Sequence, residues 1–170
     1  MLNFNKTIIS ITVGIIDFLY QGLPIERFWV LETIARAPYF SFLSVLHFKE
    51  SLGLRTEEHY YLMREHFEQT VNETEHLREM ELRGGADRWF DRFFAYHLVL
   101  LYYWIMVIYY FLNPISAYHL NAEIELHATE TYLDYFLNHP NDERIAEITA
   151  DEMNHYIELE RAMEMVKKKE

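Results

Sequence analysis

Residues 72–76 read NETEH, and residues 150–156 read ADEMNHY. Each stretch places a glutamate three positions before a histidine, close to one helical turn, so both side chains share a face about 5–6 Å apart at Cβ. Two side chains at that separation can hold one metal ion. Four-helix di-metal proteins use two such pairs, with one more glutamate from each of two other helices. The four residues of the pairs are Glu73, His76, Glu152 and His155.

The additional glutamates have candidates on the segments that precede each pair. Glu32 lies among apolar residues in RFWVLETIARAPYF, and both Glu123 and Glu125 lie in NAEIELHATETY. Chance alone would give roughly one Glu-x-x-His in a chain of this composition, so the spacing by itself is weak. The pairs lie on separate helices, each after a helix with its own glutamate. From this pattern alone, a di-metal bundle and solvated helix faces both stay open as interpretations.

Helix lengths are compatible with this placement. At 1.5 Å per residue, Glu32 and Glu73 lie about 30 Å and about 26 Å from the turn between their helices. Glu125 and Glu152 lie roughly 20 Å and roughly 15 Å from theirs. The members of each pair would therefore lie at nearly the same level of an antiparallel hairpin.

Composition restricts the chemistry and the partners. The 170 residues include no cysteine, which excludes thiolate ligands and leaves histidine and carboxylate for any metal. The net charge of −12 argues against nucleic acid as a partner, because phosphate binding needs basic surface. Only 5 glycines and 4 prolines interrupt the chain, which predicts an all-helical fold.

Breaks in the pattern predict six helical segments in a single domain, residues 1–170. Residues 1–22 are predicted to form a membrane-associated helix, and residues 24–166 the helical bundle. Pro24, Thr56 and Pro114 are suited to helix starts, and Gly84-Gly85 to a helix end. The predicted segments are about 6–20, 24–53, 56–84, 86–113, 114–138 and 141–166.

The segment from 93 to 112, FFAYHLVLLYYWIMVIYYFL, has 20 residues and no formal charge. Its length would suit a bilayer span. Its tyrosines and His97 favour a membrane interface instead. We expect a helix lying in one leaflet, with a buried core helix and a true span as alternatives.

Longer stretches resemble the alternative oxidases, and most nearly their plastid terminal oxidase type. The similarity covers about 25–156, in the family's order. It lies in LETIARAPYFSFLSVLHFKESLG (31–53), NETEH (72–76), WFDRFFAYHLVLLYYW (89–104), NPISAYHLNAEIELHATETYLDYF (113–136) and ADEMNHY (150–156). Members normally carry a longer connection between the positions that match Tyr132 and Glu152.

The resemblance implies a ferritin-like four-helix bundle with two iron ions. It selects Glu125 over Glu123 as a ligand and identifies Tyr132 with the family's redox-active tyrosine. It also identifies Arg27, Leu31 and Thr131 with residues around the quinol head group. The implied iron ligands are Glu32, Glu73, His76, Glu125, Glu152 and His155.

The activity implied by the resemblance is oxidation of plastoquinol or ubiquinol by O2, which is reduced to water without proton pumping. The implied enzyme is monotopic, bound to lipid on one leaflet of a thylakoid or bacterial inner membrane, and forms a homodimer. Two alternatives would bind iron: a di-iron hydroxylase of a quinone precursor or lipid, and a non-catalytic, ferritin-like iron-binding protein. A third alternative is a small non-catalytic membrane helical protein that binds no iron.

The other histidines are predicted to lie outside the ligand set. His47 and His127 are expected next to the metal site, as hydrogen-bonding or packing residues. His59, His66 and His139 are expected at the surface.

Overall fold

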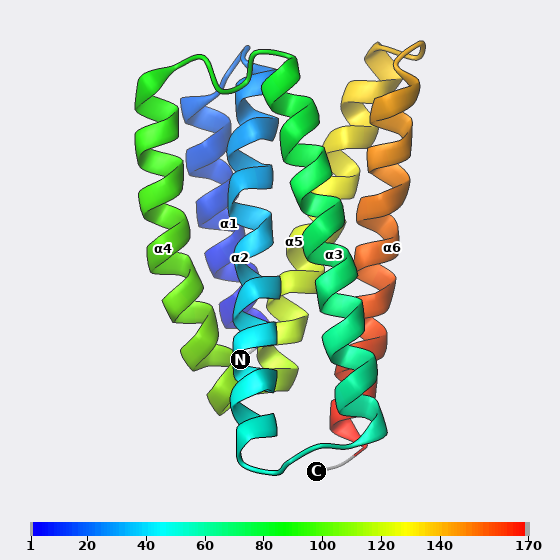
Figure 1. The fold of residues 1–170 in the computed structure, drawn as a ribbon. Coiled ribbons are helices and arrows are strands. Elements are labelled where there is room, and N and C mark those ends of the chain that lie inside the picture. Colours follow the sequence, from blue (N-terminus) through cyan, green and yellow to red (C-terminus); the bar gives the residue numbers. More distant parts are fainter. Residues whose placement is uncertain (1, 169–170) are drawn as a thin grey trace. The chain divides into compact units, whose positions relative to one another are not determined.

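The computed structural model describes residues 2–168, with side chains from residue 5 onward. Six α-helices and no strand occur in this range (Figure 1), so the predicted all-helical fold class is confirmed. Met1, Lys169 and Glu170, which the domain prediction included, lie outside the described residues. The helices are α1 (Leu2–Leu19), α2 (Pro24–Ser51), α3 (Glu57–Leu82), α4 (Trp89–Leu112), α5 (Pro114–Asn138) and α6 (Glu143–Lys167).

The helices group into two compact units. One unit, residues 14–113, holds the end of α1 together with α2, α3 and α4. The other holds the beginning of α1, up to Val13, together with α5 and α6. Each unit contains one antiparallel helix pair, α2 with α3 and α5 with α6 (Figure 1). The four helices that a di-iron bundle requires are therefore present, two in each unit. The single domain over 1–170 stays a prediction.

The end of α3 is a glycine-capped turn. Gly84 has a φ of +89°, a left-handed conformation that glycine adopts without steric penalty. The backbone N–H groups of Gly84 and Gly85 donate to carbonyl oxygens in the last turn of α3. A β-carbon on Gly85 would lie 2.6 Å from Trp29 Cβ and 2.9 Å from Ile25 O on α2. The absence of a side chain at Gly85 lets the end of α3 lie directly against the start of α2.

Aromatic contacts hold α4 on α2. The rings of Trp29 and Tyr96 meet edge-to-face with centroids 6.0 Å apart, and those of Phe42 and Tyr110 lie 4.6 Å apart. Trp29, Phe42 and Tyr110 are almost completely buried. Each ring pair of this kind stabilises the folded state by about 0.5–1.5 kcal/mol, in addition to the stabilisation from the apolar area that it buries.

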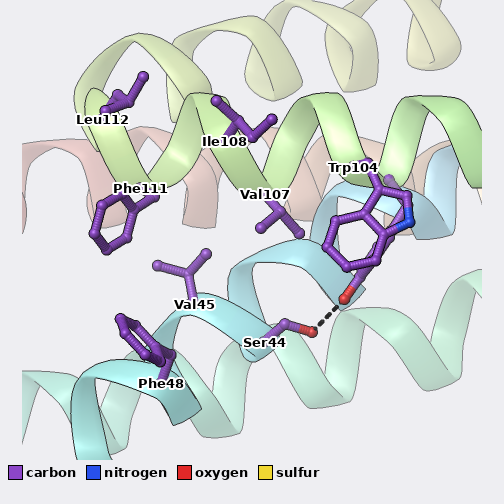
Figure 2. A pocket seen from close by; sticks show the side chains of 9 residues that line it. Ser44, Val45, Phe48, Trp104, Val107, Ile108, Phe111 and Leu112 are labelled. Atoms are coloured by element: carbon purple, nitrogen blue, oxygen red, sulfur yellow. Dashed lines mark hydrogen bonds between the residues drawn. The ribbon is translucent and has the colours of Figure 1, made fainter. Parts of the chain in front are cut away.

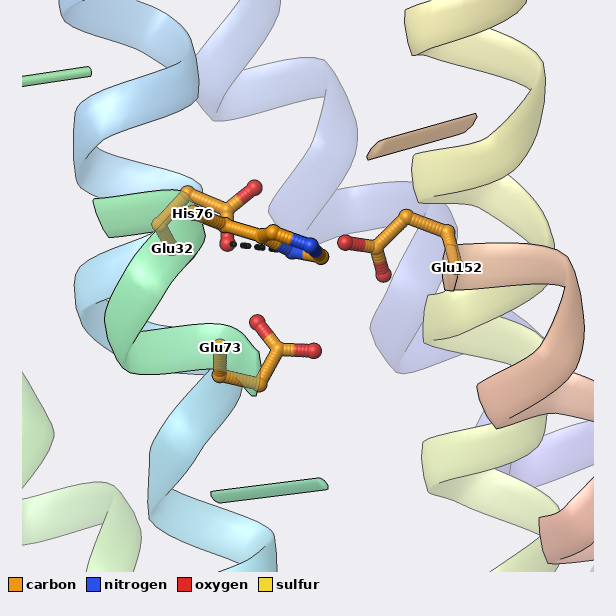
Figure 3. Close-up of side chains that lie close together, drawn as sticks. All are labelled: Glu32, Glu73, His76 and Glu152. Atoms are coloured by element: carbon orange, nitrogen blue, oxygen red, sulfur yellow. Dashed lines mark ion pairs between the residues drawn. The ribbon is translucent and has the colours of Figure 1, made fainter. Parts of the chain in front are cut away.

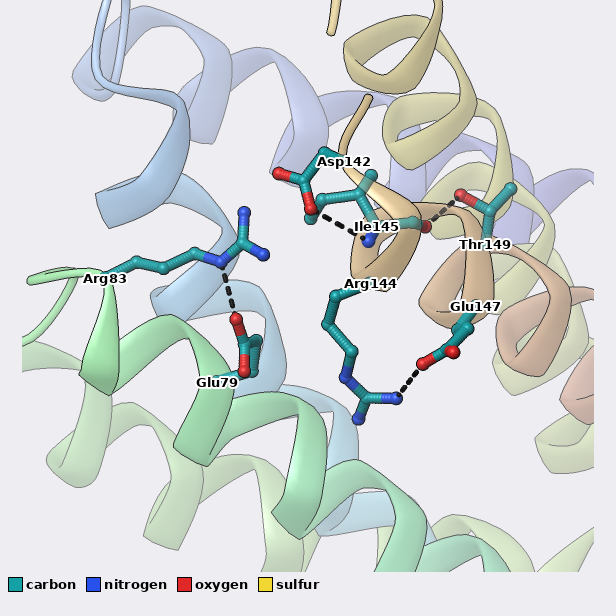
Figure 4. Close-up of polar contacts among 7 residues, drawn as sticks. All are labelled: Glu79, Arg83, Asp142, Arg144, Ile145, Glu147 and Thr149. Atoms are coloured by element: carbon teal, nitrogen blue, oxygen red, sulfur yellow. Dashed lines mark hydrogen bonds and ion pairs between the residues drawn. The ribbon is translucent and has the colours of Figure 1, made fainter. Parts of the chain in front are cut away.

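The other unit is built around the α5–α6 pair. Asp142 caps α6, since its carboxylate accepts the backbone N–H of Ile145 at 3.3 Å (Figure 4). Asn5 on α1 donates from Nδ2 to the carbonyl oxygen of Ser116 on α5 at 2.9 Å. This buried bond attaches the beginning of α1 to α5.

Most of α4 is exposed. It is the one helix of the described range long and apolar enough to cross a membrane, with a mean hydropathy of 1.6 and 17% of its most apolar stretch buried. Its buried residues number four: Asp91, Ala95, Met106 and Tyr110. The buried core helix is therefore excluded as a description of residues 93–112, whereas a helix in one leaflet and a span both fit.

Three histidine predictions are wrong. His59 and His66 are buried on α3, with 6% and 0% exposure, rather than at the surface. His47 is 78% exposed and pairs with Glu50 at 3.7 Å. For His59 and His66, the reason is that α3 turns one face inward along its whole length, and positions seven apart, such as 59, 66 and 73, share that face. His47 lies near the end of α2, beyond the last buried residue of that helix. His139 is exposed, as predicted.

His66 lies among aromatic side chains of α2. Its ring centroid is 5.0 Å from that of Phe42 and 6.1 Å from that of Tyr39, and its Nδ1 is 2.9 Å from Gln69 Oε1. Burial lowers the pKa of His66 to about 4, although the Gln69 contact acts in the opposite direction. The imidazole is therefore neutral near pH 7.

We expect His66→Leu to reduce the acid sensitivity of folding. The unfolded imidazole has a pKa of 6.5 and the folded one of about 4, so its stabilising effect is complete above about pH 6.5 and lost as pH falls towards 4. Between pH 7 and 5 the wild type should lose on the order of 2 kcal/mol through this group, and the variant should not. Urea unfolding in detergent at both pH values measures the difference. His139→Leu should behave as the wild type does, and equal acid sensitivity of the two variants would contradict the argument.

Candidate metal centre

Glu32, Glu73 and His76 form a cluster within the 14–113 unit. Glu32 comes from α2, and the other two from one turn of α3 (Figure 3). Each offers a ligand atom within 4.8 Å of the others, and His76 Nδ1 lies 3.8 Å from Glu32 Oε2. None of the three exceeds 2% exposure. The antiparallel α2–α3 pair thus brings together two carboxylates and one imidazole away from water.

A matching cluster lies within the other unit. Glu125 comes from α5, and Glu152 and His155 come from one turn of α6. Their ligand atoms also lie within 4.8 Å of one another, with His155 Nδ1 3.7 Å from Glu152 Oε2. Exposure ranges from 0% for Glu125 to 6% for His155. Both units therefore use the same arrangement: a glutamate on the first helix and a Glu-x-x-His pair on the second.

Glu123 lies outside this second cluster. Its Oε1 is 3.7 Å from Lys6 Nζ and 3.6 Å from His119 Nε2, and its side chain is 30% exposed. Glu125, two residues later, faces the opposite way around α5 and is completely buried. Between the two candidates from the sequence, the structure groups Glu125 with the α6 pair.

The donor set suits iron. Each cluster has two carboxylates and one imidazole, which are ligands that iron, manganese and zinc accept. Two buried carboxylates carry two negative charges, and burying such charges costs many kcal/mol unless cations balance them. A divalent or trivalent ion in each cluster would supply that balance, so the residues fit the metal centre that the sequence predicts.

Tyr132 is completely buried on α5, seven residues after Glu125. Seven residues are nearly two turns, so the two side chains share a face with about 10 Å of rise between them. Thr131 is half-buried, and its hydroxyl donates to the carbonyl oxygen of His127 at 2.8 Å.

Arg27 and Leu31 lie one turn apart on α2 and are half-buried. The Arg27 guanidinium pairs with Asp17 on α1, with Nη2 2.6 Å from Oδ1. Sequence reasoning did not identify Asp17 as this partner. The ion pair fixes the Arg27 side chain close to the apolar end of α1.

Two buried amides near the clusters were also missed. Gln69 lies four residues before Glu73, and Asn121 four residues before Glu125. Their exposures are 3% and 0%. The signal in the sequence was their spacing from the glutamates, since residues four apart share a helical face.

A groove of about 440 Å³ lies between α2 and α4, within the 14–113 unit (Figure 2). Its walls are apolar except at Ser44 and Tyr103, whose hydroxyl oxygens are 2.8 Å apart. The rings of Phe48 and Phe111 meet with centroids 6.0 Å apart. With neither carboxylate nor imidazole among its lining residues, the groove offers hydrocarbon contacts rather than metal ligands.

Comparison with known proteins identifies a family. A model of the family described as "Alternative oxidase" matches residues 15–166. The chain is also 46% identical over 131 residues to "Ubiquinol oxidase 4, chloroplastic/chromoplastic" from Arabidopsis thaliana. That match covers 77% of this chain and 36% of the length of the relative. No solved structure matches the chain.

These matches confirm the resemblance inferred from the sequence, and the predicted cofactor, a pair of iron ions, is that of the family. The family match extends over both helix pairs and both clusters. The chain therefore belongs to the alternative oxidases, a family of di-iron carboxylate proteins, and is of their plastid terminal oxidase type.

Proposed function

We propose that this protein is a membrane-bound quinol oxidase that transfers electrons from plastoquinol or ubiquinol to O2. The observation that carries the proposal is the pair of buried clusters, each with two carboxylates and one imidazole, in a chain of this family. In the proposal the two clusters together form one di-iron centre. Its ligands are Glu32, Glu73, His76, Glu125, Glu152 and His155.

The reaction balances with two quinols for each O2. Each quinol gives up two electrons and two protons and leaves as quinone, and one O2 takes up four of each to become two waters. Iron ions held by these ligands would supply electron storage, by changing valence, and a site for O2. In the proposal, the reaction pumps no protons across the membrane.

The chain's own residues bind the quinol and transfer charge. In the proposal, Arg27 donates hydrogen bonds to a quinol oxygen while Asp17 holds its guanidinium in place. Leu31 packs against the ring, and Thr131 offers its hydroxyl oxygen. Tyr132, buried and on the same face of α5 as Glu125, passes on one electron and one proton at a time.

Attachment to one membrane leaflet completes the proposal. Large apolar side chains are exposed on α1, including Ile11, Ile15 and Phe18 at 54–81%. Many more are exposed along α4, which is compatible with insertion into lipid. A quinol dissolved in the same leaflet would then reach the protein without crossing water. A homodimer stays a prediction.

Removal of one ligand from either cluster should abolish activity. Purified wild type should bind about two irons per chain and consume O2 with a plastoquinol or ubiquinol analogue. Glu73→Ala and His155→Ala should lower the iron content and reduce uptake by more than about 100-fold, because losses outside the ligand set alone cost 10–100-fold.

Exposed residues on the same two helices provide controls for the ligand variants. Glu75→Ala on α3 and Met153→Ala on α6 should retain iron and activity. Full activity in either ligand variant would contradict the proposed centre. Transfer of labelled oxygen from O2 into an organic product would instead indicate a hydroxylase.

Tyr132→Phe should retain fold, iron and membrane attachment but lose turnover. Phenylalanine keeps the shape of the ring but cannot give up a proton with an electron. We expect quinol-dependent O2 uptake to fall on the order of 100-fold, the typical effect of losing a positioned proton-transfer group. Tyr135→Phe is the matched control, because Tyr135 stacks on His139 at 4.1 Å at the exposed end of α5. Equal turnover in the two variants would remove the role of Tyr132.

Acidic residues on the exposed face of α4 should release the protein from membranes. Leu100 and Ile108 are 62% and 58% exposed. Replacing both with Glu would place two charges in hydrocarbon, at roughly 3 kcal/mol each near the centre of a bilayer. Flotation of vesicles with bound protein measures attachment. Glu substitution at Arg64 and Arg78, exposed on α3, should leave attachment unchanged, and accessible protease sites on both sides of the vesicle would indicate a span.

A further inference from the structure

Gln69 and Asn121 carry side-chain nitrogens that make no hydrogen bond with any residue in the described range, 2–168. For Asn121 the same holds for the side-chain oxygen. Both residues are nearly inaccessible to solvent, at 3% and 0% exposure. A buried polar atom without a hydrogen bond costs about 1–3 kcal/mol, so the unpaired side-chain nitrogens of these two amides indicate a use other than stability.

Both amides occupy the same position relative to a proposed ligand. Gln69 precedes Glu73 by four residues on α3, and Asn121 precedes Glu125 by four residues on α5. Side chains on a helix lean towards its N-terminus, so a glutamate leans over the residue four positions earlier. Each amide therefore lies on the side of the helix towards which the carboxylate extends. Because each relation is contained in one helix, it depends on local backbone geometry alone.

His66 fixes the orientation of the Gln69 amide. Its Nδ1 is 2.9 Å from Gln69 Oε1, so an Nδ1–H donates to the amide oxygen. Aromatic contacts with Phe42 and Tyr39 hold the imidazole in place. With its oxygen engaged, Gln69 presents the N–H groups of Nε2 as its remaining hydrogen-bonding capacity.

We infer that Gln69 and Asn121 are positioning residues that donate hydrogen bonds to the carboxylates of Glu73 and Glu125 when these hold iron. The inference rests on the proposed di-iron centre and names a pair of residues that supports it. A metal-bound carboxylate keeps lone pairs that do not face the metal, and an N–H donor to such an oxygen makes a charge-assisted bond. Donors of this kind orient the ligand and raise metal affinity.

Isosteric apolar substitutions test the inference, because both should weaken iron binding while Asn121→Leu leaves the iron-free protein no less stable. Asn121→Leu and Gln69→Met remove each amide while keeping its approximate volume. Iron-free Asn121→Leu should be as stable as the wild type or more stable, because a buried amide without a partner has been removed. Iron-free Gln69→Met should lose some stability, because the buried Nδ1–H of His66 loses its acceptor. Fe(II) affinity, measured by competition with a ferrous chelator, should fall about 10–100-fold.

Asn5→Leu is the matched control, since Asn5 is a buried amide that does donate a hydrogen bond, to Ser116 O. This variant should lose iron-free stability and keep the Fe(II) affinity of its folded fraction. Thermal unfolding of the metal-free proteins, followed by circular dichroism, gives the stability of all three variants.

Unchanged Fe(II) affinity in both Asn121→Leu and Gln69→Met would overturn the inference. A fall in the affinity of Asn121→Leu accompanied by a loss of iron-free stability like that of Asn5→Leu would also overturn it, because a structural role would then suffice. Failure of the wild type to bind iron would contradict the proposed function itself, so the two failures are distinguishable.

Discussion

Carboxylates held away from water are the constraint on which the rest of this structure depends. Glu32, Glu73, Glu125 and Glu152 are each at most 2% exposed. A low-dielectric interior tolerates such groups only when cations and hydrogen-bond donors surround them. Two helix pairs answer this requirement in the same way, each with two carboxylates and one histidine on facing helices. Metal coordination explains why these carboxylates are buried, whereas packing alone does not, because apolar side chains would fill the same space at lower cost.

The rest of the chain serves the opposite requirement, contact with an apolar environment. α4 keeps most of its apolar side chains exposed and is attached to α2 through a few buried rings. α1 likewise exposes isoleucine and phenylalanine side chains. The proposed quinol oxidation would require both kinds of surface in one small protein, an apolar one for the quinol and a buried one for the metal ligands. The ion pair between Arg27 and Asp17 joins α2, which carries the predicted ligand Glu32, to α1, which carries exposed apolar side chains.

Helix positions were largely predictable from the sequence, because residues typical of helix starts and ends mark most of the boundaries. Pro24 and Pro114 begin helices, Thr56 caps one, and Gly84 ends one, as expected. The choice between Glu123 and Glu125 was not accessible from residue pattern alone, since both are glutamates on one helix. The resemblance selected Glu125, and the structure groups that residue with the α6 pair.

The histidines show why the remainder was harder to predict. A polar helix such as α3 suggests a solvated residue at 66, yet the face that carries Glu73 stays inward for the full length of the helix. Exposure of His47 reflects the end of α2, where the buried face gives way to an exposed one. The amides of Gln69 and Asn121 were missed for another reason: their four-residue spacing from a glutamate is informative only when that glutamate is considered as a metal ligand.

Gly85 has a mechanical consequence for the α2–α3 pair. Its backbone lies directly against Trp29 and Ile25, so this contact limits how far α3 can slide along α2. From Leu82, where α3 ends, back to His76 is about 9 Å of helix, over which an α-helix is stiff. The position of α3 along α2 that is set at Gly85 therefore also sets how Glu32 lies relative to Glu73 and His76. A single methyl group at position 85 would push α3 away from α2 and so change the spacing of metal ligands that it does not touch.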